Sequence, residues 1–351
     1  MLKYVNQIIN PYKDKVMNFD YFIGIDVSKS ELDFSVIKSA NELFHIKVEN
    51  SLEGIRAFIK KLKLETEFDF NKCLFCMEHT GIYNNHLLEY FTKKKAHLCL
   101  ESAVHIKQSS GLQRGKNDRI DSLRIALYAY KNKESLRLWQ PKRDVIKRLI
   151  SLTALRSRLV NALKQLKTPL DEEDDFSDKS IHKKTRSLCD ASIKTLKKDL
   201  EKLDKEIKDI AVSDQELNRL FSIVCSVEGV GIVTATQLII STNEFKDITE
   251  AKKFACYSGV APFEHSSGSS IRGKTRVSRM ANKKVKTLLH MAALASIIAK
   301  GEMKEYFNRK VNEGKNKMAV LNAIRNKIIL RVFSCVRENR KYEKNYTYSV
   351  A

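Results

Sequence analysis

The sequence predicts an α/β protein in which a mixed sheet with helices on its faces is followed by a mainly helical part. Residues 21–49 alternate apolar and polar side chains with a period of two, which is typical of strands. Segments with helical spacing and short apolar runs then alternate up to about residue 131. After residue 141, apolar side chains recur every three or four positions, which is the pattern of long helices that pack side by side.

Three antiparallel strands are expected at the start of the sheet. Their sequences are FIGIDVS, ELDFSVIKS and ELFHIKVEN, and short polar turns separate them. Ser51 then has the position of an N-cap for a helix. The apolar residues of that helix are Leu52, Ile55, Phe58, Ile59 and Leu62. A short apolar strand over residues 72–77 follows and ends at Glu78.

After Glu78, the sequence predicts a helix over residues 84–95, a strand over 97–100 and a helix over 118–131. A loop punctuated by glycines at residues 111–115 precedes the last helix. The order is therefore β-β-β-α-β-α-β-α. In a sheet of this kind, strand ends and helix starts gather along one rim, which is where we expect a site.

Two long helices are expected after Pro141. One contains Leu149, Leu152, Leu159, Leu163 and Leu166, and the other contains Leu196, Leu200, Leu203, Ile207 and Ile210. They form either paired antiparallel helices or a dimeric coiled coil. The acidic run at 171–175 between them is a solvated linker or, alternatively, a contact for a basic partner surface. The predicted domains are 20–135, a helical coiled-coil region at 141–215, a mainly helical domain at 216–300 and a basic helical tail at 301–351.

The charge balance favours a nucleic-acid partner. The chain has 351 residues, 64 Lys and Arg against 42 Asp and Glu, and a formal net charge of +22. Such an excess attracts polyanions, although ribosome-like binding or an anionic membrane would also fit. The apolar stretch at 286–299 is shorter than the roughly 20 residues that span a bilayer. We therefore expect a cytoplasmic protein without a membrane partner, with its 7 cysteines as buried thiols rather than zinc ligands.

Four carboxylates are candidate metal ligands. Asp26 interrupts an apolar strand, Glu78 ends another, and Asp118 and Asp121 lie one turn apart on one helix face. Carboxylates gathered at one rim would repel each other, and a hard divalent cation, magnesium or manganese, would relieve this. The alternatives are that Asp118 is a helix cap, Asp121 an ion-pair partner of Arg124, and Asp26 a turn residue.

A second group of candidates lies in the helical part. The segment SVEGVGIVTA at 226–235 is similar to a helix-hairpin-helix, in which Gly229 and Gly231 leave backbone N–H groups for a phosphate. A Gly-x-Gly turn also joins ordinary packed helices. Residues 257–279 then predict a Ser/Gly loop in which the basic residues are phosphate contacts and His265 is a conceivable base. These basic residues are Arg272, Lys274, Arg276 and Arg279.

Taken together, these segments resemble a known family. GIDVSK, MEHTGIY and KNDRID, in this order, look like the DEDD motifs of a RuvC-like transposase domain of the insertion-sequence one-ten family. GVAP, SSG, VSR and LLHMAA are similar to the C-terminal transposase domain of the same family. One departure is Met280-Ala281-Asn282, which stands where a glycine usually follows the Ser-Arg pair.

The resemblance implies an RNase H-like fold for residues 20–135, with Asp26, Glu78, Asp118 and Asp121 as catalytic magnesium ligands. It implies that a loop serine attacks DNA; by position this is Ser267, with Ser266 as its competitor. Lys29 and Arg119, inside the acidic motifs, are expected nucleic-acid contacts. It further implies a structured guide RNA and dimers that pair into tetramers. Two alternatives are a metal-dependent nuclease or Holliday-junction resolvase without a serine intermediate, and a non-catalytic RNA-binding scaffold.

Overall fold

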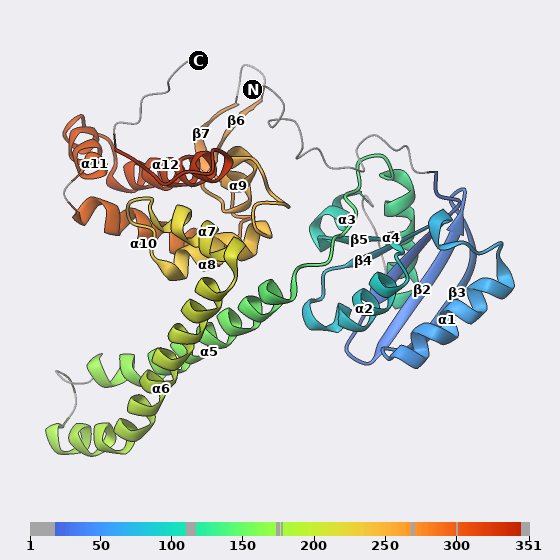
Figure 1. Ribbon diagram of the computed structural model, residues 1–351, viewed down its shortest axis with the longest axis horizontal. Coiled ribbons are helices and arrows are strands. Elements are labelled where there is room, and N and C mark those ends of the chain that lie inside the picture. Colours follow the sequence, from blue (N-terminus) through green and yellow to red (C-terminus); the bar gives the residue numbers. More distant parts are fainter. Residues whose placement is uncertain are drawn as a thin grey trace. The chain divides into compact units, whose positions relative to one another are not determined.

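The computed structural model describes residues 18–109, 117–172, 176, 178–267, 271–299 and 301–344. The side chains at 265–267, 271, 272 and 274 are outside this description, as are the expected loop at 111–115 and residues 173–175. The chain divides into two compact units, Met1–Pro141 and Lys142–Ala351 (Figure 1). None of the helices in the described ranges combines the length and the apolar character that a bilayer crossing requires.

The first unit contains a five-stranded mixed sheet. Its strands are β1 (Tyr21–Val27), β2 (Glu31–Lys38), β3 (Asn41–Glu49), β4 (Cys73–Glu78) and β5 (His97–Glu101), in the spatial order β3-β2-β1-β4-β5. β1, β2 and β3 are antiparallel neighbours, whereas β4 and β5 continue the sheet in parallel with β1. The three expected antiparallel strands and the mixed sheet are therefore confirmed.

Helices cover both faces of this sheet (Figure 1). One apolar core joins the sheet to α1 (Leu52–Glu65) and α2 (Asn85–Lys93), and the other joins it to α3 (Ala103–Ser109) and α4 (Asp118–Lys131). Two short 3₁₀ helices, Phe70–Lys72 and Gly81–Asn84, precede β4 and α2. These two 3₁₀ helices and α3 were not expected from the sequence. The alternation along β1 explains the two cores, because successive side chains of a strand point to opposite faces.

Local capping explains where two of these helices begin. Ser51 Oγ accepts a hydrogen bond from the Gly54 N–H at 3.0 Å, as its position predicted. Asn117 Oδ1 accepts one from the Arg119 N–H at 3.1 Å, so α4 begins at Asp118. The backbone N–H groups of a first helical turn lack intrahelical partners, and these side chains supply them.

The second unit begins with a helical hairpin. α5 (Asp144–Glu172) and α6 (Lys179–Ser213) lie side by side along much of their length (Figure 1). Arg156 Nε donates to Asp204 Oδ1 at 2.6 Å, and Arg148 Nη2 donates to Glu206 Oε1 at 2.6 Å. Of the two expected arrangements, the helices pair within one chain, and a dimeric coiled coil is not confirmed.

The rest of this unit is a helical domain with one small hairpin of strands. Its elements are α7 (Gln215–Cys225), α8 (Ile232–Thr242), α9 (Ala251–Tyr257), β6 (Pro262–Ser267), β7 (Ile271–Val277), α10 (Lys283–Ile298), α11 (Glu302–Asn312) and α12 (Lys317–Arg337). α12 comes from the segment expected to be a basic tail. Its buried side chains are part of the central core of the unit; they are Val320, Leu321, Ile324, Arg325, Ile328, Ile329, Val332, Phe333 and Cys335.

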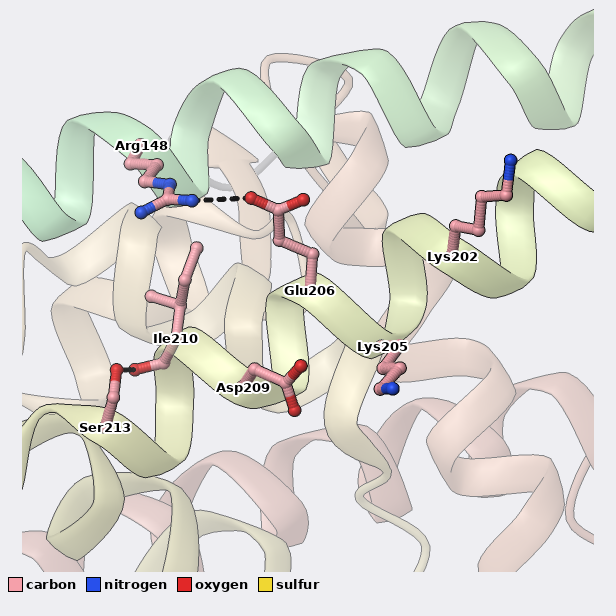
Figure 2. A pocket seen from close by; sticks show the side chains of 7 residues that line it. All are labelled: Arg148, Lys202, Lys205, Glu206, Asp209, Ile210 and Ser213. Atoms are coloured by element: carbon pink, nitrogen blue, oxygen red, sulfur yellow. Dashed lines mark hydrogen bonds and ion pairs between the residues drawn. The ribbon is translucent and has the colours of Figure 1, made fainter.

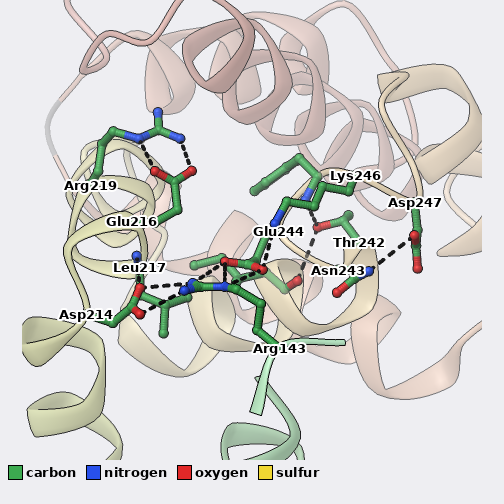
Figure 3. Close-up of polar contacts among 12 residues, drawn as sticks. Arg143, Asp214, Glu216, Leu217, Arg219, Thr242, Asn243, Glu244, Lys246 and Asp247 are labelled. Carbon is green, nitrogen blue, oxygen red and sulfur yellow. Dashed lines mark hydrogen bonds and ion pairs between the residues drawn. The ribbon is translucent and has the colours of Figure 1, made fainter. Parts of the chain in front are cut away.

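An ion network fixes the start of α5 to this domain (Figure 3). Arg143 Nη1 donates to Asp214 Oδ2 at 2.8 Å, and Arg143 Nε donates to Glu244 Oε1 at 3.0 Å. Asp214 also caps α7 by accepting from the Leu217 N–H at 2.9 Å. Glu244 is 5% exposed and lies in a run of three residues with positive φ, residues 243–245. Its buried charge and its unfavourable backbone conformation are tolerated because Arg143 is bound to it.

Candidate active site

The four predicted acids come from elements that meet at one edge of the sheet. Asp26 lies near the end of β1, and Glu78 is the last residue of β4. Because β1 and β4 are parallel neighbours, their carboxyl-terminal ends reach the same edge. The first turn of α4, which packs on β1, contains Asp118 and Asp121. We call these four residues the acidic rim.

Gly24 determines how closely α4 approaches the strand that carries Asp26. A Cβ atom at Gly24 would lie 2.0 Å from the backbone oxygen of Ser122 and 2.3 Å from the backbone nitrogen of Ala126. No residue other than glycine fits there without moving α4. The Ser122 hydroxyl also hydrogen-bonds to the Ser35 hydroxyl of β2 at 2.8 Å. These contacts hold the first turn of α4 over the sheet.

The surroundings of Asp26 disfavour its charged form. Burial, followed by the negative charges of Asp121, Asp118, Asp33 and Glu78, raises the pKa of Asp26 to about 6. The other three predicted acids therefore each act on Asp26. A carboxylate in this setting becomes more stable when it gains a proton or a nearby cation.

Cationic side chains hold part of the acidic rim. Arg124 Nη1 donates to Asp121 Oδ1 at 2.7 Å, and Lys47 Nζ lies 4.0 Å from Asp118 Oδ2. Among the described residues, no three His, Cys, Asp or Glu side chains are arranged to hold one metal ion. The donor set itself consists of carboxylate oxygens, which suit magnesium or manganese, and four other carboxylates act on the partly buried Asp26.

The structural alternatives for the acids have mixed outcomes. The ion pair between Asp121 and Arg124 is confirmed. Asp118 is not the cap of α4, because Asn117 occupies that position. Asp26 is not a turn residue either, since it pairs with Asp33 inside the antiparallel ladder of β1 and β2.

Two polar residues beside the acidic rim were missed from the sequence. Asp33 lies opposite Asp26 in the ladder and is 5% exposed. Its Oδ1 is 2.8 Å from His45 Nε2 of β3. The sequence could have indicated Asp33, because it stands between the core residues Leu32 and Phe34. A short turn after Val27 also fixes the strand register that places Asp33 opposite Asp26.

A second missed acid, Glu101, ends β5 beside Glu78. It is tied down by its neighbours: Tyr128 of α4 donates its hydroxyl to Glu101 Oε2 at 3.0 Å, and His105 Nδ1 lies 2.9 Å from Glu101 Oε1. Glu101 therefore joins β5 to α3 and α4. The setting of Asp26 differs, because the charged groups that act on it are carboxylates, which together with burial raise its pKa.

The two basic residues expected to contact nucleic acid at this rim are both at the surface. Lys29 is exposed in the turn after β1. Arg119 is also exposed and donates from Nη2 to Glu42 Oε2 at 3.2 Å. Nucleic-acid contact by Lys29 and Arg119 stays a prediction.

The two glycines of the turn in the second unit, Gly229 and Gly231, have different environments. Gly229 has a φ of +84°, and a Cβ there would lie 2.2 Å from the backbone oxygen of Ala292 in α10. Gly229 is therefore a packing residue. Gly231 is the N-cap of α8, is exposed, and has open space where a Cβ would be. Of the two predicted phosphate contacts, Gly231 has the more accessible backbone.

The expected Ser/Gly loop is corrected by the structure, because its flanks form the β6–β7 hairpin. Ser266 pairs with Arg272 and Ser267 with Ile271, and residues 268–270 between the strands lie outside the described residues. The side chains of both serines, His265, Arg272 and Lys274 lie outside them as well. The Arg276 and Arg279 side chains are exposed. The departure at Met280-Ala281-Asn282 has a structural role: Asn282 Oδ1 caps α10 by accepting from the Val285 N–H at 3.1 Å.

A shallow groove of about 520 Å³ lies on the α5–α6 hairpin (Figure 2). It is lined by Arg148, Lys202, Lys205, Glu206, Asp209, Ile210 and Ser213. Its lining contains both acids and bases, and Arg148 is paired with Glu206. None of the predicted site residues lines this groove, so it does not support the chemistry expected of the acids or the serines.

Comparison with known proteins gives these features a context. A DEDD model of the IS110 family, described as "Transposase", matches residues 23–172, and the model "Transposase IS116/IS110/IS902 family" matches residues 222–308. The first match contains the acidic rim and the second contains the glycine turn and the hairpin. Together they cover more than half of the chain and define it as a transposase, a DNA-modifying enzyme. The chain belongs to the IS110 family of transposases.

Individual relatives agree with this assignment. The chain is 26% identical to the "Pilin gene-inverting protein" of Moraxella bovis over 92% of this chain and 98% of that protein. A protein of the same description from Moraxella lacunata matches equally well. A 43.6 kDa protein of the insertion element IS110 from Streptomyces coelicolor is 29% identical over 36% of this chain and 31% of its own length.

Proposed function

We propose that this protein cuts and rejoins DNA with two groups, the carboxylates of the acidic rim and a nucleophilic serine on the β6–β7 hairpin. The observation that carries the proposal is the setting of Asp26, in which burial and then the negative charges of the surrounding carboxylates raise its pKa to about 6. An enzyme keeps such an unfavourable group where its chemistry needs it. We further propose that the first unit, with its mixed sheet and acidic edge, is a RuvC-like domain of RNase H type.

The acidic rim would hold divalent metal, with Asp26, Glu78, Asp118 and Asp121 as ligands. Bound magnesium or manganese would supply charge stabilisation for the phosphate under attack. The protein's own part is to hold the acids in place: Gly24 lets α4 lie directly on β1, and Ser35 and Ser122 join β2 to α4. Arg124 keeps Asp121 oriented.

The nucleophile would be Ser267, with Ser266 as its competitor. In the proposed step the serine Oγ forms a bond to phosphorus while the bond from phosphorus to the leaving deoxyribose oxygen breaks. The hydroxyl proton passes to a base, for which His265 is the nearest candidate in the sequence. Cationic side chains would stabilise the attacked phosphate, and Arg276 and Arg279 are exposed on and beside β7.

The kind of rearrangement follows from the relatives. Two of them are named for inversion of a pilin gene, and others belong to insertion elements. We infer that this chain either moves an insertion element or inverts a DNA segment. A structured guide RNA and an assembly of dimers into a tetramer are part of the same proposal, as is action in the cytoplasm. The high positive charge supports binding of DNA and RNA.

Trapping the covalent intermediate tests the proposal. The protein is incubated with its element-end DNA and magnesium, denatured, and run on a gel that separates free DNA from protein-linked DNA. We expect an adduct with the wild-type chain and none with Ser267→Ala, because the attacking oxygen is removed. Ser266→Ala is the matched neighbour and should retain the adduct.

The same experiment separates the alternatives. An adduct that persists in both serine variants contradicts the serine mechanism. Strand cleavage without any adduct, lost in an Asp26 variant, would instead indicate a metal-dependent nuclease or junction resolvase. A chain that binds RNA but changes no DNA in any condition would match the scaffold hypothesis.

A further inference from the structure

A buried arginine in α12 has no carboxylate partner among the described residues. Arg325 of α12 is 7% exposed. Its guanidinium contacts only neutral groups among the described residues: Nη2 is 2.7 Å from His290 Nδ1, and Nη1 is 3.4 Å from Asn322 Oδ1. Its Nε is buried and has no hydrogen-bond partner among them. Buried charges in proteins are normally paired, so this one has a place for an anion.

The chemistry of the neighbours agrees with an anion site. Arginine has no acceptor atom, so His290 Nδ1 must accept and the ring proton is on Nε2, where it is a second donor. Burial and the charge of Arg325 lower the pKa of His290, which keeps the ring neutral. Burial also lowers the pKa of Arg325. His290 and Asn322 are only half-buried, so the cluster reaches the surface.

The position of this cluster connects it to the hairpin. Asn322 donates from Nδ2 to the backbone oxygen of Val260 at 2.9 Å. Val260 stands two residues before Pro262, where β6 begins. α12 and α9 are in contact, so the cluster lies where the hairpin leaves the helical domain. An anion bound by Arg325 would therefore lie at the base of the element that carries Ser266 and Ser267.

We propose that Arg325, with His290 and Asn322, binds a phosphodiester of the nucleic acid on which the protein acts. A guanidinium has the donor geometry that a phosphate needs, and a dry site strengthens the contact. This inference rests on the proposed function, because it assumes a nucleic acid beside the hairpin. It adds a binding residue from α12, outside both matched segments.

The test compares Arg325→Met with Arg337→Met in the full-length protein. Arg337 lies on the same helix but is 74% exposed and 3.4 Å from Glu338. Binding of a short DNA duplex and of a short RNA strand is measured at several salt concentrations. We expect Arg325→Met to lower affinity about tenfold and the salt slope by about one phosphate contact. Arg337→Met should change affinity by less than about threefold.

A thermal melt of the same variants excludes a purely structural role. Met fills the volume without an unpaired charge, so free Arg325→Met should melt at the same temperature as the wild type or higher. Arg325→Lys should retain part of the binding. A loss confined to DNA or to RNA identifies the source of the phosphate.

Two results would overturn the assignment. One is an Arg325→Met variant that melts several degrees lower while its affinity and salt slope match the wild type. The other is a loss of affinity equal to that of Arg337→Met. Both are distinguishable from failure of the proposed function, which is the absence of a serine adduct in a wild-type chain that still binds DNA.

Discussion

The acidic rim of the first unit and the Arg143 network of the second unit both gather charges, but they differ in balance. Around Asp26 the neighbours are four other carboxylates, and its pKa rises to about 6. Around Arg143 each charge has an opposite partner, and the pKa of Asp214 falls because Arg143 donates to it. The same residue types therefore produce repulsion in one unit and cohesion in the other.

This difference in charge balance distinguishes a candidate ligand site, the acidic rim, from a structural ion network, the Arg143 network. The Arg143 network lets Glu244 stay buried in a left-handed backbone conformation, and it leaves no charge uncompensated (Figure 3). The acidic rim has an excess of negative charge, which lowers the stability of the folded protein unless a cation binds. Arg325 is the corresponding case of a positive charge, because no carboxylate among the described residues pairs with it. Uncompensated charge of this kind points to candidate sites for a ligand of opposite charge.

Removing the charge of Asp26 should have the largest effect and would test the claim that the rim is functional. Asp26→Asn keeps the size of the side chain but removes a proposed metal ligand. We expect DNA rearrangement to fall by about 10³-fold or more, as removal of essential groups does in other enzymes, while the free protein becomes no less stable. Both are measured with the purified protein, by product formation and by denaturant unfolding.

Asp20→Asn is the matched control for this change. Asp20 precedes β1, is about half exposed, and lies 3.5 Å from Lys72. Its variant should rearrange DNA like the wild type. Activity retained in Asp26→Asn, or a marked loss of its stability, would mean that the two charge clusters do not differ in the way described.

Breaking the Arg143 network should affect stability most. Arg143→Met leaves Asp214 and the buried Glu244 without their main partner. We expect the free energy of unfolding to fall by about 3 kcal/mol, at the lower end of the range for broken buried pairs, since Lys246 still contacts Glu244. Denaturant unfolding measures this loss.

Arg148→Met serves as its control on the same helix. Arg148 is paired with Glu206, but both side chains are well exposed, so the cost should be at most about 1 kcal/mol. Equal losses in the two variants would show that burial of Glu244 does not distinguish the network from a surface pair.

The sequence predicted most of the first unit because its signals are local. Helix α4 begins and ends at the expected residues, since Asn117 caps it and its apolar positions follow helical spacing. The four acids could be singled out because Asp26 interrupts an apolar strand, Glu78 ends another, and Asp118 and Asp121 lie in the first turn of a helix, and their role as metal ligands stays a prediction. Asp33 and His45 were missed because their positions depend on pairing between strands, which no single segment displays.

The second unit was harder to predict for two physical reasons. The serines and glycines of residues 266–273 favoured a loop, although residues 271–277 alternate in a period of two that is typical of a strand. In α12 the Lys and Arg residues suggested a basic helical tail; the segment is helical, but its apolar residues line a face that the core buries. Arg325 lies among them, so composition alone could not distinguish it from a surface charge.

Moving α4 relative to β1 should have the next largest effect, because it disturbs the rim without removing a charge. Gly24→Ala places a methyl group against the backbone of Ser122 and Ala126. We expect about 1–3 kcal/mol of lost stability from overpacking and about 10²-fold lower activity from misplaced acids. Gly231→Ala is the stability control, because its Cβ would meet open space, and it should unfold like the wild type. Full activity in Gly24→Ala would show that the approach of α4 does not position the acids.

The pH dependence of stability should show the smallest effect. It tests most directly whether the acidic rim has an excess of negative charge. The folded-state pKa of Asp26, about 6, is above its ordinary value of 3.8, so the folded protein binds the additional proton between these values. Stability must then fall as pH rises through about 6 and recover as pH is lowered. Melting temperatures at pH 5 and pH 7.5, compared between wild type and Asp26→Asn, isolate this contribution. The wild type should lose a few degrees more than the variant on going to the higher pH, and manganese should reduce that difference, since a bound cation replaces the proton. Parallel pH profiles in the two proteins would mean that the rim carries no uncompensated charge, and its contrast with the Arg143 network would disappear.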